Sequence, residues 1–200
     1  YLARHVALRA GRPIETPAVT VNRLCGSGFE SIIQGAQQIM LGLSEVVLAG
    51  GMENMTRVPY LLPDMRMGHR LGHTEAVDAM YQDGFLCPLA EQLMGETAET
   101  LAALYAITRE EQDAFAAESQ AKAAAAIQAG RFKGEIVPIE IPQRKGDPLV
   151  FDTDEFPRAT TVEALAKLRP AFQSEGVVTA GNSSGINDGA AALVLMSAAK

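Results

Sequence analysis

The segment Val21-Asn22-Arg23-Leu24-Cys25-Gly26-Ser27-Gly28 places a cysteine where an extended stretch gives way to a helix. Before it, residues 17–22 place two valines on one face of an extended chain. After it, apolar residues recur at helical spacing over residues 29–43. Residues 45–49 then form a short apolar run that ends at Gly50-Gly51 and predicts a buried strand. A strand, a helix and a strand of these lengths predict one parallel βαβ unit and therefore an α/β fold.

Cys25 lies at the predicted strand-to-helix turn, where Gly26 and Gly28 leave room for a substrate carbonyl group. A thiol at the start of a helix is close to the positive end of the helix dipole and to unpaired backbone N–H groups, which stabilise a thiolate. The same N–H groups can donate to an oxyanion on a bound carbonyl. Cys25 is therefore a candidate nucleophile. The alternative is a buried structural cysteine, which is the commonest fate of an unpaired cysteine.

The middle of the chain predicts an insertion into this α/β unit. Residues 54–88 are rich in proline, methionine and glycine, which indicates a long irregular segment. Helical patterns follow over residues 89–105 and 108–130, and the second begins with the capping box Thr-Arg-Glu-Glu. The apolar run 190–196 then fits a central strand of the first sheet. The insertion is therefore expected between strands of one domain.

Composition and charge exclude several classes of function. The chain has 200 residues, of which 48% are hydrophobic and 20% charged, as in a soluble globular protein with a real core. Its net charge of -7 argues against a nucleic-acid partner, because such partners need a basic surface. It contains no apolar stretch of membrane-spanning length and no signal peptide, so no membrane partner is expected. Cys25 and Cys87 form neither a disulfide framework nor a zinc pattern, which favours a cytoplasmic location.

Two further features suggest ligand binding but have simpler explanations. His69 and His73 lie four residues apart, as metal ligands on a helix do, but their glycine neighbours favour an exposed loop, and no metal is expected. The insertion also carries basic residues that suit phosphate groups, although a solvated charged face is more usual. These residues are Arg131, Lys133, Arg144, Lys145, Arg158, Lys167 and Arg169.

Motifs along nearly the whole chain resemble those of the thiolase family and occur in the family's order. They comprise residues 21–28, Gly50-Gly51-Met52-Glu53-Asn54-Met55, Met94-Gly95-Glu96-Thr97-Ala98-Glu99, residues 109–115, Gly130-Arg131-Phe132-Lys133, Lys167-Leu168-Arg169-Pro170-Ala171-Phe172, and residues 179–185 and 187–191. No single motif is decisive, but the set in this order is highly specific. The sequence is therefore identified as a member of the thiolase family.

The resemblance implies a layered α/β sandwich in which two similar halves form five layers. An α-rich loop domain that binds coenzyme A is inserted in the first half. In this chain the core α/β domain would comprise residues 1–52 and 177–200, and the loop domain residues 53–176. The C-terminal half would lie beyond Lys200, and both ends of the sequence are interpreted as truncation points.

The resemblance also assigns site residues by position. Cys25 would accept the acyl group, and Arg158 would lie near the adenine and phosphate end of coenzyme A. The other predicted coenzyme A and substrate contacts are Leu168, Phe172, Ala180 and Ser184 along the adenine and pantetheine path, and Phe85, Leu93 and Met94 around the acyl group. Many acetoacetyl-specific thiolases have histidine at the position of Leu93, so the acyl-length preference stays open.

Other catalytic groups of the family are missing from this sequence. Thiolases also use a histidine in a Gly-His-Pro motif, a second cysteine in a Cys-Gly-Gly motif and an asparagine before Glu-Ala-Phe, and none of these motifs occurs here. They belong to the family's C-terminal half. The resemblance therefore implies an active parent enzyme and an inactive isolated chain.

The implied activity is acyl transfer between coenzyme A thioesters through an acyl group on Cys25. Coenzyme A would be a co-substrate, with no other cofactor, in fatty acid metabolism, and the full-length protein would be a homodimer or homotetramer. One alternative is a ketoacyl synthase of the same fold, which condenses decarboxylatively. Another is a non-catalytic acyl-CoA-binding or assembly subunit, and a redox-sensing thiol is a third.

Overall fold

The chain forms two compact units in a computed structural model that describes residues 1–200 apart from the side chain of Asp83. The first unit contains residues Tyr1–Val58 and Asn187–Lys200, and the second contains Pro59–Ile186. The second unit is thus an insertion in the sequence of the first. Its borders lie some residues beyond those expected after residues 52 and 176.

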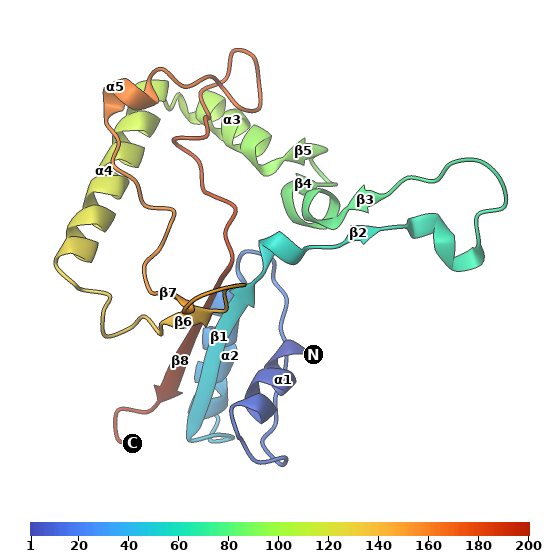
Figure 1. The fold of residues 1–200 in the computed structure, drawn as a ribbon, viewed down its shortest axis with the longest axis vertical. Coiled ribbons are helices and arrows are strands. Elements are labelled where there is room, and N and C mark those ends of the chain that lie inside the picture. The colour runs from blue at the N-terminus through green and yellow to red at the C-terminus, as the bar shows by residue number, and fades with distance from the viewer. The chain divides into compact units, whose positions relative to one another are not determined.

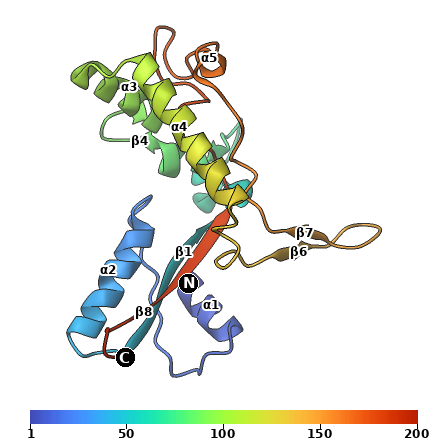
Figure 2. The ribbon, with the colours of Figure 1, turned by 90° about the vertical axis from the view of Figure 1, so that its left-hand side faces the viewer.

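The first unit consists of a two-stranded ribbon and two helices. Its elements are α1 (Leu2–Arg9), α2 (Ser27–Met40), β1 (Val46–Glu53), the 3-10 turn η1 (Met55–Arg57) and β8 (Gly189–Met196). Helix α2 lies along β1 and β8 (Figure 1), and Figure 2 shows α1 on the opposite side of the ribbon. Gly35 permits the close packing of α2, because a Cβ atom there would lie 2.8 Å from Leu195 and 3.1 Å from Val47.

The prediction of a parallel βαβ unit is wrong, because the described residues form no such unit. Residues 17–22 form no strand, and strand β1 pairs instead with β8 in an antiparallel register from Val46 opposite Met196 to Glu53 opposite Gly189. The run 190–196 is a strand as predicted, but β1 is its sole partner among the described residues. An extended pattern becomes a strand only when a neighbour completes the hydrogen-bond ladder, and local sequence does not identify that neighbour.

The two glycines expected to end β1 lie inside it instead, because the strand continues to Glu53. Gly50 lies against the backbone of β8, where a Cβ atom would collide with the carbonyl oxygen of Ala191. Glycine at this position therefore permits close approach of the two strands rather than ending one of them.

The second unit begins with the irregular segment that the sequence predicts. This part comprises β2 (Tyr60–Leu61), η2 (Pro63–Met67), β3 (Val77–Asp78), the π-helical turn η3 (Tyr81–Phe85), β4 (Leu86–Cys87) and β5 (Gln92–Leu93). Each of these strands has two residues, so the segment contributes turns and short hairpins rather than a sheet.

Helices and a hairpin make up the rest of the second unit. They are α3 (Met94–Tyr105), α4 (Arg109–Gln128), β6 (Ile139–Ile141), β7 (Leu149–Phe151) and α5 (Val162–Leu165). The capping box of α4 is confirmed, since the Thr108 amide donates to Glu111 at 2.8 Å and the Glu111 amide donates to the Thr108 hydroxyl at 3.2 Å. Helix α3 begins later than expected because the β4–β5 hairpin precedes it. The β6–β7 hairpin extends away from α4 (Figure 2).

The core of the second unit mixes apolar and polar side chains. Ala102, Leu165 and Val178 are buried, and so are Thr179 and the carboxylates Glu99 and Asp113, which are 6% and 1% exposed. Among the described residues, no helix combines the length and apolar character needed to cross a lipid bilayer.

Candidate active site

Cys25 lies in a tight turn that two side chains hold in place. The preceding Leu24 has a left-handed backbone conformation with φ of 50°, which is uncommon for a residue with a side chain. Its amide donates to the Asn22 side chain at 2.9 Å. The Ser27 hydroxyl accepts from the Arg23 amide at 2.9 Å and donates to the Leu24 carbonyl at 2.7 Å. These bonds stabilise the strained turn, as is common at functional sites.

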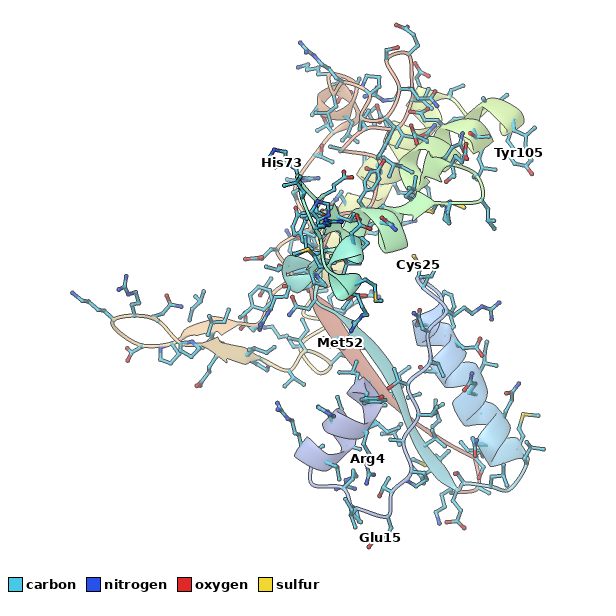
Figure 3. All side chains as sticks on the ribbon, turned by 90° about the vertical axis from the view of Figure 1, so that its right-hand side faces the viewer. Arg4, Glu15, Cys25, Met52, His73 and Tyr105 are labelled. Carbon is cyan, nitrogen blue, oxygen red and sulfur yellow. The ribbon has the colours of Figure 1, made fainter. Side chains whose placement is uncertain are left out.

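The turn presents the Cys25 thiol to solvent. Cys25 is exposed, and Figure 3 shows it at the end of α2 where the helix begins. The amides of Gly26 and Ser27 already donate to the carbonyls of Arg23 and Leu24 at 3.0 Å. They are therefore occupied, and donors for an oxyanion must come from other groups. The thiol itself is accessible to a carbonyl carbon, as nucleophilic attack requires.

An ion pair lies beside this turn. The Arg23 guanidinium contacts the Glu30 carboxylate at 2.7 Å, and its methylene groups cover Gly26. Hydrogen bonds from Gln34 and then from Arg23 hold the pKa of Glu30 below its ordinary value. Arg23, which precedes α2, is therefore held in an ion pair by Glu30 in the first turns of the helix.

The structure brings three of the predicted coenzyme A contacts into one cavity of the second unit. Arg158, Leu168 and Ala180 line a pocket of about 270 Å³, together with Thr160, Ala164, Leu165 and Gly181. Arg158 donates to the Ala180 carbonyl at 3.4 Å and lies over the Phe156 ring, 5.3 Å from its centre. The pocket thus combines an exposed cation with apolar walls.

The predicted acyl-group residues form a separate cluster in the same unit. Leu93 pairs with Leu86, the neighbour of Phe85, and Met94 begins helix α3. The Phe172 ring packs on Gly95, where a Cβ atom would overlap it. Phe172 therefore lies beside this cluster. Ser184 is exposed and does not line the 270 Å³ pocket.

A second cavity, of about 410 Å³, lies where α3 meets α4. Its lining includes Tyr105, which Figure 3 shows at the end of α3, and Phe115. It contains none of the predicted site residues. The described residues include no group of three or more histidine, cysteine or carboxylate side chains placed to hold a metal ion, and His69 and His73 are exposed.

The sequence predicts no role for several polar residues that lie beside the 270 Å³ pocket. Glu99 accepts from the amides of Val177 and Val178 at 2.9 Å, and Asp113 contacts both Arg109 and Asn182. One available signal was the spacing of Arg109 and Asp113, which are four residues apart on a helix. No local pattern predicts that their partners lie in a distant loop.

Comparison with known proteins identifies the family. The sequence profile described as "Thiolase, N-terminal domain" matches residues 1–199. The chain therefore belongs to the thiolase family, as the sequence motifs predicted, and corresponds to the family's N-terminal domain.

Individual relatives agree with this assignment. An acetyl-CoA acetyltransferase from Pseudomonas aeruginosa is 59% identical over 99% of this chain and 51% of its own length. A probable acetyl-CoA acyltransferase from Staphylococcus aureus is 52% identical over 98% of this chain and 50% of its own length. The chain thus spans about half the length of the curated relatives it matches.

Solved structures confirm the predicted α/β thiolase fold. The acetyl-CoA acetyltransferase from Syntrophomonas wolfei has a TM-score of 0.93 and 44% identity, covering 98% of this chain and 49% of that protein. Human mitochondrial 3-ketoacyl-CoA thiolase has a TM-score of 0.93 and 45% identity, covering 100% of this chain and 50% of that protein.

Proposed function

We propose that Cys25 is the nucleophile of a thiolase and accepts an acyl group from a coenzyme A thioester. The observation that carries this proposal is an exposed thiol, next to a strained residue, at the start of a helix in a thiolase N-terminal domain. The relatives named acetyl-CoA acetyltransferase support the choice of reaction.

In the proposed reaction the Cys25 thiolate attacks the ketone carbon of a 3-ketoacyl-CoA. The bond between the ketone carbon and the adjacent methylene carbon breaks, and its electron pair leaves with acetyl-CoA, whose carbanion takes up a proton. The acyl group stays on Cys25 as a thioester until the thiol of a second coenzyme A displaces it. Covalent capture divides one difficult carbon–carbon step into two easier ones. Run in reverse, the reaction condenses two acetyl-CoA molecules.

The second unit would hold coenzyme A. The exposed guanidinium of Arg158 suits phosphate oxygens, and Leu168 and Ala180 supply apolar surface for the adenine end. The cluster of Phe85, Leu93 and Met94, with Phe172 beside it, would border the acyl group. Ser184 would contact the pantetheine arm.

The remaining parts of the proposal concern the whole protein. The base that activates Cys25 and the donor that protonates the carbanion would come from the C-terminal thiolase domain, so the isolated chain would not turn over. Coenzyme A would act as co-substrate without another cofactor or a metal. We further propose a cytoplasmic homodimer or homotetramer that acts in fatty acid metabolism.

The test compares alkylation of the two cysteines by iodoacetamide, followed peptide by peptide with mass spectrometry. Acetyl-CoA should slow the reaction of Cys25 more than that of Cys87, which is half-buried in the second unit. The variant Arg158→Ala should lose this protection. An unchanged Cys25 rate at saturating acetyl-CoA would contradict the proposal.

A further inference from the structure

The second unit buries a charged group that the proposed reaction does not use. Asp113 is 1% exposed, and both of its carboxylate oxygens are paired. One accepts from Arg109 Nε at 2.7 Å, and the other accepts from the Asn182 amide group at 3.0 Å. A buried carboxylate is costly unless it is paired in this way, and removing a partner costs more than the pair contributes.

Arg109 connects Asp113 to the first wall of the 270 Å³ pocket. Its Nη2 atom donates to the carbonyl of Leu165 at 2.6 Å and to that of Leu168 at 3.1 Å. Leu165 and Leu168 both line the pocket. The planar guanidinium contacts Asp113 and this wall at the same time, which the point charge of a lysine does not reproduce.

Asn182 connects Asp113 to the second wall. Its amide nitrogen also donates to the Val177 carbonyl at 3.0 Å, and its oxygen accepts from the Thr179 amide at 2.7 Å. The fully buried Thr179 accepts from the Gly181 amide through its hydroxyl at 3.2 Å. Ala180 and Gly181 therefore lie where this network places them, and Ala180 in turn accepts from Arg158.

We propose that Asp113 is a positioning residue that fixes both walls of the pocket through Arg109 and Asn182, and thereby raises the affinity for coenzyme A. Walls that are already ordered before the ligand arrives lose little conformational entropy on binding, which raises the affinity. The identity of the ligand rests on the proposed function. The coupling of the two walls rests on the contacts alone.

The test measures coenzyme A binding by calorimetry and backbone amide exchange without ligand. Asp113→Asn leaves one oxygen where two bonds are accepted, so we expect coenzyme A to bind about tenfold more weakly. Amide exchange should accelerate in residues 165–168 and in residues 177–183. Arg109→Lys should accelerate the first segment alone, and Asn182→Ala the second alone, because each variant removes the link to one wall.

A control separates positioning from general destabilisation. Ala102 is buried in helix α3 and lines neither the 270 Å³ pocket nor the 410 Å³ cavity, so Ala102→Gly should lower the melting temperature and leave the coenzyme A dissociation constant unchanged. Equal affinity of Asp113→Asn and the wild type, or loosening of one wall alone, would overturn the inference. Failure of the wild type to bind coenzyme A counts against the proposed function, while the exchange data still decide whether Asp113 couples the walls.

Discussion

Leu24 adopts its left-handed conformation directly before Cys25, and the cost of that backbone geometry is offset by its neighbours. The side chains of Asn22 and Ser27 together make three hydrogen bonds to the backbone of Arg23 and Leu24. These bonds hold the turn that places Cys25 directly before α2. The nucleophilic role proposed for Cys25 would therefore depend on short polar residues beside it in the sequence.

Removal of the Ser27 hydroxyl should slow the reaction of Cys25. In Ser27→Ala the turn loses two of its three side-chain hydrogen bonds. The turn is then less ordered and holds the thiol less firmly beside the positive end of the helix dipole, so we expect alkylation about two- to fivefold slower. Ser27→Thr should restore the rate because it keeps the hydroxyl. Ser31→Ala is the matched control, since the Ser31 hydroxyl donates to the Gly28 carbonyl one turn further along the helix. A Ser27→Ala rate equal to the wild-type rate would show that the turn does not need this support.

Asp188 gives the first unit a pH dependence. Its carboxylate accepts from the Thr56 amide at 2.9 Å, and this bond holds the pKa of Asp188 below its ordinary value of 3.8. The stabilisation is therefore complete above that value and is lost as the pH falls through the lower pKa of the folded state. The Thr56 amide resonance should report this transition in an NMR titration. Asp188→Asn should show no such transition, and a midpoint at or above 3.8 would contradict the assignment.

The β1–β8 ribbon depends on one close approach of the two strand backbones. Gly50→Ala should force the strands apart because its methyl group would meet the Ala191 carbonyl, at a cost of about 1–3 kcal/mol. Gly51→Ala is the matched control, because the nearest atom to its Cβ would be Gly28 Cα at 3.9 Å. Amide exchange over residues 46–53 should be faster in the first variant than in the second. Similar exchange in both would show that the ribbon tolerates the methyl group.

The sequence predicts those elements whose signals are local. The capping box at Thr108 fixes the start of α4, and the helix after Cys25 follows from its apolar spacing. The partner of β1 is not predicted, because residues 46–53 pair with residues 189–196, far along the chain. The position of Gly50 inside β1 is not predicted for the same reason, since the glycine is needed for a close contact with that distant strand.

In the candidate site, too, the sequence predicts residues with local signals and fails for contacts between distant segments. Cys25 is predicted because its glycine-rich turn is continuous in sequence, and Arg158, Leu168 and Ala180 are predicted from family motifs. The positioning role proposed for Asp113 has no such signal, because its burial and pairing arise where α4 meets residues 177–183. Burial of a charged residue is a property of the folded unit and has no signature in the local pattern.

The chain has the nucleophile of the proposed reaction in one compact unit and the proposed coenzyme A pocket in the other. It spans about half the length of the relatives it matches. In the proposed reaction Cys25 would therefore carry the acyl group, and the C-terminal thiolase domain would transfer the protons.

The most direct measurement is the mass of the Cys25 peptide after the whole protein that carries this chain has been incubated with acetyl-CoA and quenched in acid. An acetyl thioester should appear on Cys25, persist in Cys87→Ala and disappear when free coenzyme A is added. Binding of acetyl-CoA without any acetyl group on Cys25 would contradict the role of this thiol and leave a binding module in place of an acyltransferase.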